Sequence, residues 1–214
     1  MKDQIEIFEP TKKSMNVIVV VATVIAFFVM QLWEKNSTPG TFTGHTTEFL
    51  LQHGALYGPK VFEGEWYRLV TYLFLHGDIW HLGNNMLILY CLGNALEHYV
   101  GKVPYVTIYF FSGILAALGY VVYNTGSPVC VGASGAVFGV TGAMAWLVII
   151  NKGRLEGFSG PRMVMFVLMS VYTGFVDQGV DNAAHIAGLV AGFLLAILLY
   201  RKPSEPKVET EVIP

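Results

Sequence analysis

Charged residues are scarce in this chain, since only 13% of its 214 residues are Asp, Glu, Lys or Arg. A soluble domain usually has about 25% charged residues, so the deficit argues against a soluble globular protein. Cysteine is nearly absent as well. Cys91 and Cys130 are too few for a disulfide framework, and their spacing fits no metal-binding motif. The net charge of −2 gives no indication of nucleic-acid binding.

Hydrophobic residues make up 54% of the chain, and long stretches carry no charge. Residues 14–33 form an uncharged run of 20 residues, enough to cross the roughly 30 Å hydrocarbon core of a bilayer as a helix. A second run, 103–151, is interrupted by the turn-forming sequence YNTGSP at 123–128. We therefore predict an all-α polytopic membrane protein. Its six spans are expected at about 14–33, 79–99, 103–123, 132–150, 161–176 and 183–200.

The positions of the basic residues predict how these spans are oriented. An even number of spans places both termini on one side, and ten of the 13 lysines and arginines fall there. Only Lys35, Lys60 and Arg68 fall on the other side. Cytoplasmic loops are usually enriched in basic residues. We therefore expect residues 1–13 and 201–214 to be cytoplasmic tails on either side of a membrane domain at 14–200.

Three polar side chains lie near the outer ends of predicted spans that run in the same direction. His81 lies near the start of the second span, Ser134 near the start of the fourth and His185 near the start of the sixth. A serine hydroxyl is a weak nucleophile that needs a neighbouring base, and His185 is the best-placed intramembrane histidine. The sequence thus indicates a nucleophile and a base at similar depth, although depth alone does not bring them together laterally.

Glycine is concentrated beside both side chains. Gly188 and Gly192 are four residues apart on the sixth span and would form a small-residue seam that lets another helix approach closely. Gly132, Gly135 and Gly139, around Ser134, would give the fourth span a matching thin surface. We expect Gly132, Gly135 and Gly188 to support the site. A purely structural packing role is the other interpretation of these glycines.

A possible oxyanion hole lies in the sequence HLGNN at 81–85. His81 and Asn85 are four residues apart and share one helix face, so both could donate hydrogen bonds to a developing oxyanion. Ordinary interhelical hydrogen bonding is the alternative. Other chemistries lack their motifs: the chain has no HExxH sequence, no aspartate pair within the spans, and Ala136 where the hydrolase motif G-x-S-x-G requires glycine.

Taken in order along the spans, these motifs resemble those of the rhomboid intramembrane serine proteases. The resemblance covers about residues 15–200. It rests on GASGAVFG at 132–139, HLGNN at 81–85, AHIAGLVAGF at 184–193, EWYRLVTYLFLHGD at 65–78 and LGNALEHYVGK at 92–102.

The resemblance implies a six-transmembrane-helix bundle and a role for each site residue. Ser134 would be the nucleophile and His185 the general base of a dyad without an aspartate. The oxyanion hole would be formed by His81, Asn85 and the backbone N–H of Ser134. Many relatives stack a tyrosine on the histidine, and this chain has Phe138 at that position, which keeps the stacking but not the hydroxyl.

The expected reaction is hydrolysis of peptide bonds near the outer end of transmembrane helices in protein substrates. We expect no cofactor and no metal, and a site that faces the outside of a bacterial inner membrane. Because the reaction needs neutral His185, activity should fall on acidification. The short fifth span and the loop at 174–182 are the expected gate and cap. Two alternatives are a proteolytically silent rhomboid-like client binder and a proton-coupled transporter with His81, Asn85 and His185 as its relay.

Other polar residues are expected to have structural roles. Arg68 should anchor the outer loop between the first two spans, and Glu97 should satisfy buried polar groups near the inner end of the second. His76, one turn before the second span, is expected to give structural support, and support of the candidate site is the alternative. The three remaining histidines are expected to be solvated: His45, His53 and His98.

Overall fold

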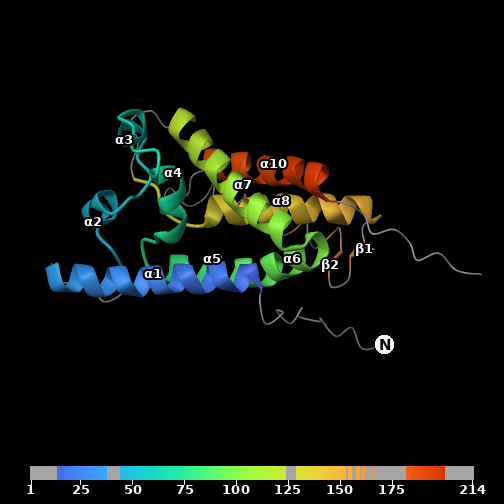
Figure 1. Cartoon of the computed structure of the whole chain (residues 1–214), viewed down its shortest axis with the longest axis horizontal. Coiled ribbons are helices and arrows are strands. Elements are labelled where there is room, and N and C mark those ends of the chain that lie inside the picture. The colour runs from blue at the N-terminus through green and yellow to red at the C-terminus, as the bar shows by residue number, and fades with distance from the viewer. Residues whose placement is uncertain are drawn as a thin grey trace, which may run out of the picture.

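The chain folds into a bundle of helices, seen here in a computed structural model that describes residues 14–37, 44–123, 129–152, 154–155, 158–159, 161, 165 and 182–200 (Figure 1). The helical segments in the ranges of predicted spans are α1 (Met15–Ser37), α5 (Ile79–Ile88), η2 (Leu89–Gly93), α6 (Asn94–Val100), α7 (Lys102–Tyr123), α8 (Ser134–Ile150) and α10 (Asn182–Leu199). Short segments between α1 and α5 are α2 (Thr47–Gln52), α3 (Gly58–Phe62), α4 (Arg68–Thr71) and η1 (Tyr72–Phe74).

The predicted helical class is confirmed for the bundle, with one small correction. Two strands of two residues each, β1 (Arg154–Leu155) and β2 (Phe158–Ser159), pair antiparallel just after α8. Lys152, with φ +57°, turns the chain out of the helix before them, and so short a hairpin leaves no periodic sequence signal. The predicted fifth span at 161–176 and the predicted cap at 174–182 fall almost wholly outside the described residues.

Helices occupy the other five ranges that the sequence marks as spans. Three segments of the described chain are long and apolar enough to cross a membrane: Met15–Glu34 within α1, the whole of α7 and the whole of α10. The helix α8 is equally apolar but has 17 residues. The segments α5, η2 and α6 form one continuous helix, because their junction residues Leu89 and Asn94 keep helical dihedral angles. Its middle part, η2, is a single π-helical turn.

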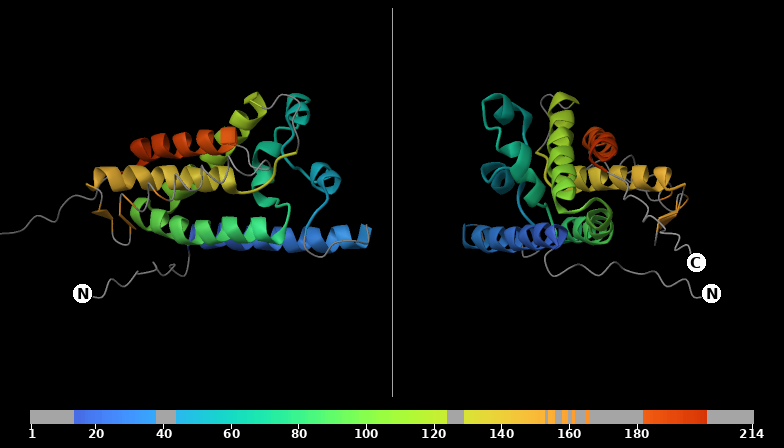
Figure 2. Two further views of the ribbon diagram at one scale, coloured as in Figure 1. Left: turned by 180° about the vertical axis from the view of Figure 1, so that it is seen from behind. Right: turned by 45° about the vertical axis from the view of Figure 1, so that its right-hand side comes forward.

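The helices form two groups joined by α7. In Figure 1, α1 contacts the helix formed by α5, η2 and α6 along the bottom of the view, and α8 and α10 lie next to each other above them. The right-hand view of Figure 2 shows that the two helices of each pair cross at an angle. The helix α7 crosses between the groups and packs against α8 and α10. The short helices α2, α3 and α4 gather at one end of the bundle. Both Ser134 and His185 lie in the first turns of their helices at that same end.

Glycines set the distance between α8 and α10. A Cβ atom on Gly188 would overlap the carbonyl oxygen of Gly135, and one on Gly192 would overlap that of Gly139. Since residue 188 faces 135 and residue 192 faces 139, the two helices run in the same direction, with the first turn of α8 beside the second turn of α10. The predicted close backbone approach is therefore confirmed.

At the other end of the bundle, Glu97 fixes the beginning of α1. Its carboxylate accepts hydrogen bonds from the backbone N–H groups of Met15 and Asn16, both at 2.9 Å, and from Ser14 Oγ at 2.8 Å. The first N–H groups of a helix have no partner within the helix, so the carboxylate supplies the acceptor that α1 lacks. The expected role of Glu97 as a partner for buried polar groups is confirmed.

The side chain of His45 bonds to a buried carboxylate near the end of α1. His45 Nδ1 lies 2.6 Å from Glu34 Oε2, and the His45 side chain is only 1% exposed. The same carboxylate accepts bonds from the backbone N–H of Thr46 at 2.8 Å and from its hydroxyl at 2.7 Å. The ring of His45 packs against Phe27 and Phe49. The expectation that His45 is solvated is therefore wrong, because its ring is buried together with the Glu34 carboxylate that bonds to it.

The other two histidines differ from each other. His53 is half-buried. Its ring centroid lies 4.5 Å from that of Trp33, and its Nδ1 lies 2.7 Å from the carbonyl oxygen of Phe49. The expectation that it is solvated is thus wrong in part. His98 is exposed, as expected.

Candidate active site

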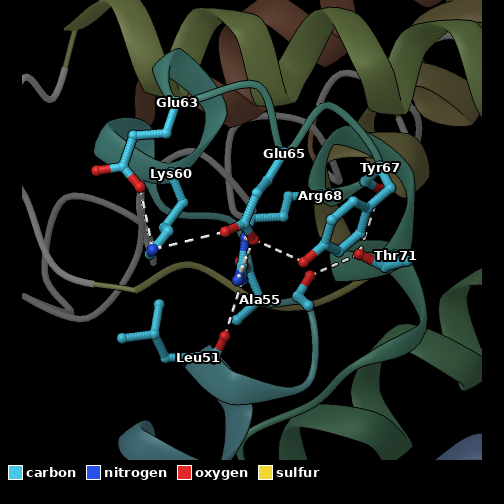
Figure 3. Close-up of polar contacts among 9 residues, drawn as sticks. Leu51, Ala55, Lys60, Glu63, Glu65, Tyr67, Arg68 and Thr71 are labelled. Atoms are coloured by element: carbon cyan, nitrogen blue, oxygen red, sulfur yellow. Dashed lines mark hydrogen bonds and ion pairs between the residues drawn. The ribbon is translucent and has the colours of Figure 1, made fainter.

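Arg68 and Glu65 hold together the part of the loop that leads to the candidate site, as Figure 3 shows. The guanidinium Nη1 donates to the carbonyl oxygens of Leu51 at 2.8 Å and Ala55 at 2.6 Å. Its Nε and Nη2 lie 2.8 and 2.7 Å from Glu65 Oε2. The Arg68 side chain is buried. The expected role of Arg68 as an anchor of the loop between the first two predicted spans is confirmed.

Ser134 is the first residue of α8. Ala133 before it has φ −73° and ψ −4°, and the first bond of the helix runs from Val137 N–H to the Ala133 carbonyl. The first N–H groups of a helix point out of its end without intrahelical partners, and the helix dipole makes this end electropositive. A negative charge that develops beside Ser134 Oγ would therefore face a favourable field.

The hydroxyl of Ser134 contacts His185 on α10. His185 Nε2 lies 2.9 Å from Ser134 Oγ, which is hydrogen-bond distance. The imidazole stacks on Phe138, one turn further along α8, with ring centroids 4.2 Å apart and planes inclined by 7°. Within the described residues, His185 Nδ1 has no hydrogen-bond partner. The structure thus brings together a hydroxyl, an imidazole and an aromatic ring, and no carboxylate of the described residues bonds to this imidazole.

The glycines around Ser134 each meet a different neighbour. Gly132 has φ +121°, a conformation that only glycine adopts readily. A Cβ there would lie 2.7 Å from both Cε1 and Nε2 of His81. A Cβ on Gly135 would lie 2.6 Å from the Cβ of Ala116 and 3.0 Å from the Tyr72 hydroxyl. The absence of side chains at these positions lets α7 and the His81 ring approach the serine turn.

His81 and Asn85 lie on the neighbouring helix α5, beside Gly132. The carboxylate of Asp78 caps this helix by accepting from the N–H groups of Trp80 at 2.8 Å and His81 at 2.9 Å. Asn85 is buried, and its Nδ2 donates to the His81 carbonyl oxygen at 3.0 Å. An amide nitrogen carries two N–H groups, so this bond leaves the second for another acceptor. The predicted pair is therefore close to the serine turn, with one amide hydrogen already used.

His76 belongs to the same cluster, which favours support of the site over a purely structural role. Its side chain is fully buried, and its Nε2 accepts a hydrogen bond of 3.4 Å from the backbone N–H of Ala133. Its ring centroid lies 5.1 Å from that of His81. Burial, with a contribution from nearby His81, lowers the pKa of His76 to about 3. The only sequence signal for this contact is the position of His76 one turn before the second span.

A comparison with known families identifies one match. The family model described as Rhomboid domain matches residues 63–202. This range contains every residue of the candidate site described above. It begins within the loop between α1 and α5 and leaves out α1.

Three curated relatives show how far the similarity extends. The chain is 30% identical over 198 residues to "Rhomboid protease GluP" of Bacillus subtilis, covering 92% of this chain and 37% of that protein. It is 36% identical over 174 residues to "RHOMBOID-like protein 5" of Arabidopsis thaliana, covering 80% of this chain and 56% of that protein. It is 35% identical over 147 residues to "Putative rhomboid protease YdcA" of Bacillus subtilis, covering 68% and 73% respectively. The chain thus spans less than two thirds of the first two relatives.

Proposed function

The chain belongs to the rhomboid family, and from that premise we propose that it is an intramembrane serine endopeptidase with Ser134 as nucleophile and His185 as general base. The observation that carries the proposal is the distance of 2.9 Å between Ser134 Oγ and His185 Nε2. Two further facts support it. The imidazole is held by stacking on Phe138, and several relatives that cover most of this chain are named as rhomboid proteases.

The proposed reaction proceeds through an acyl-enzyme. Ser134 Oγ attacks the scissile carbonyl carbon while its proton passes to His185 Nε2. The tetrahedral intermediate then collapses, the peptide C–N bond breaks, and the imidazolium gives its proton to the leaving amine. A water molecule, deprotonated by His185, attacks the ester carbonyl and releases the new carboxyl end. Because both deprotonations need a neutral imidazole, the rate should fall on acidification.

The oxyanion of each tetrahedral intermediate would be held by three donors. These are the backbone N–H of Ser134, the second N–H of the Asn85 amide and the His81 imidazole. The positions of His81 and Asn85 beside Gly132 support this assignment. The electropositive end of α8 adds to it, since preorganised donors and dipoles usually give the largest electrostatic contribution to such reactions.

We further propose that the chain crosses the membrane six times, with both termini in the cytoplasm and the site near the outer face. The biased distribution of lysine and arginine supports this orientation. Substrates would be transmembrane proteins that carry helix-breaking residues near the outer ends of their spans, because an intact helix hides its carbonyl groups in hydrogen bonds. The loop at 174–182 would act as the cap. A bacterial inner membrane is the proposed location.

A serine-directed phosphonate probe tests the nucleophile directly. We expect the wild type to be labelled and to cleave a model transmembrane substrate in liposomes, and Ser134→Ala to do neither. Ser112→Ala is the matched control, because Ser112 is also buried in the bundle but its hydroxyl donates to the Ile108 carbonyl within its own helix at 2.6 Å. This variant should keep both signals.

The outcomes separate the protease from its main alternative. If Ser134→Ala is folded but is labelled like the wild type, Ser134 is not the nucleophile. If a folded wild type is neither labelled nor active on several substrates, the protein is a silent client binder that shares the rhomboid fold. Co-purification of uncleaved membrane proteins with the wild type would then be expected.

A further inference from the structure

The backbone just before Ser134 is fixed at three successive points. Residues 130–133, called the serine strap below, pair first with Leu56, since the N–H and C=O of Cys130 each bond to Leu56 at 2.9 Å. Gly132 N–H then donates to the Tyr72 carbonyl at 3.0 Å. Ala133 N–H finally donates to His76 Nε2 at 3.4 Å. Only the last of these three contacts depends on the identity of a side chain.

His76 also contacts the proposed oxyanion hole from a second direction. Its ring meets that of His81 edge to face, with centroids 5.1 Å apart and planes inclined by 68°. The His81 ring also fits closely against Gly132 of the serine strap. The His81 ring therefore contacts both the His76 ring and the strap, and His76 itself bonds to the strap at Ala133, so displacement of His76 would loosen both neighbours at once.

The chemistry of the contact requires one protonation state. An imidazole nitrogen accepts a hydrogen bond only when it carries no proton, so neutral His76 with its hydrogen on Nδ1 is the form that fits Ala133 N–H. Full burial of the ring favours this neutral form. The bond also consumes the Ala133 N–H, the donor immediately before that of Ser134. The N–H of Ser134 is the next backbone donor along the chain after Ala133.

We propose that His76 is a positioning residue of the active site, holding the Ala133 peptide and the His81 ring so that the Ser134 N–H and His81 face one oxyanion. This inference rests on the proposed protease function and deepens it. His76 touches no reacting atom. Its loss should therefore weaken stabilisation of the tetrahedral intermediate, which lowers kcat, and leave substrate binding largely unchanged.

Three substitutions separate positioning from simple packing. His76→Gln places an amide acceptor near the position of Nε2, His76→Asn places one near Nδ1, and His76→Leu fills the space without an acceptor. We expect kcat on a transmembrane substrate in liposomes to fall by roughly 10- to 100-fold in His76→Leu and His76→Asn, less than the roughly 100- to 1,000-fold cost of deleting an oxyanion donor outright. KM should change by less than about twofold. His76→Gln should recover at least about a third of the wild-type kcat, and phosphonate labelling rates should follow the same order.

Thermal unfolding in detergent is measured on the same samples. Similar unfolding temperatures for His76→Gln and His76→Leu, with different kcat, would support positioning. Equal losses of kcat in the two variants, or an unchanged kcat in folded His76→Leu, would overturn the proposal and leave the protease assignment intact. A wild type that is neither labelled nor active would overturn both. If His76→Leu does not fold, the polar pair His76→Gln and His76→Asn decides by the same criteria.

Discussion

Phe138 determines how the His185 imidazole meets Ser134. The two rings lie almost parallel at 4.2 Å, and aromatic pairs of this kind contribute about 0.5–1.5 kcal/mol beyond area burial. The stack restricts rotation of the imidazole about its Cβ–Cγ bond, so Nε2 stays directed at the hydroxyl. The contact needs only a ring face. Many relatives have tyrosine at this position, and phenylalanine presents the same ring face to the imidazole.

Glu65 gives the outer loop a pH dependence with a definite sign. Hydrogen bonds from Tyr67 and Arg68 lower the pKa of the Glu65 carboxyl. A lowered pKa stabilises the docked loop above the unfolded carboxyl pKa, about 4.3. This contribution is lost as the pH falls through the lower, folded value. We expect hydrogen-exchange protection of residues 51–71, corrected for intrinsic rates, to fall below about pH 4.

Two variants show whether Glu65 is the group that titrates. Glu65→Gln should have low protection at every pH between 3 and 7, because a neutral amide cannot form an ion pair with the Arg68 guanidinium. Glu63→Gln is the control, since Glu63 contacts only Lys60 among the residues drawn in Figure 3. It should retain the wild-type profile. A wild-type profile in Glu65→Gln would refute the assignment.

Contacts between helix faces could be predicted from the sequence, whereas contacts across loops could not. Ser134, His185 and Phe138 lie in local motifs whose spacing places them on helix faces, and the helices then bring them together. His76 and His45 find their partners across loops, at Ala133 and Glu34. A contact across a loop depends on how the loop folds, and no periodicity in the sequence encodes it.

The pairing of α8 with α10 depends on glycines that face backbone atoms. We predict that Gly192→Ala lowers the free energy of unfolding by about 1–3 kcal/mol, because its Cβ would overlap the Gly139 carbonyl oxygen and overpacking has this cost. Labelling of Ser134 should slow as the helices separate. Gly83→Ala is the matched control, since nothing lies within 4 Å of a Cβ there. It should be neutral or stabilise α5 by about 0.5–1 kcal/mol.

Unfolding in detergent and phosphonate labelling rates measure both effects. A neutral Gly192→Ala would mean that α8 and α10 separate at no cost, contrary to the close approach in the structure.

At the scale of elements, the uncharged runs predicted where most helices lie, since composition and length determine such helices directly. The strand pair β1–β2 and the π-helical turn η2 were not predicted, because each involves only a few residues.

The orientation of the whole molecule can be tested with two lysines at opposite ends of the bundle. Lys60, in the outer loop, and Lys102, at the start of α7, are both exposed enough to react as cysteines. In a background with Cys91→Ser and Cys130→Ser, a membrane-impermeant maleimide should label Lys60→Cys in intact cells. Lys102→Cys should react only after the membrane is broken. The reverse pattern would place the site on the cytoplasmic face.

The position of His185 has a consequence for biosynthesis. Its helix α10 is the last described helix in chain order, and Ser134 precedes it by 51 residues. Synthesis proceeds from the N-terminus at about 5–20 residues per second. For several seconds each new molecule therefore holds the proposed nucleophile in the membrane without its base. On the proposed function, proteolytic competence begins only when α10 has docked on α8, so unfinished chains cannot attack other proteins at the site of membrane insertion.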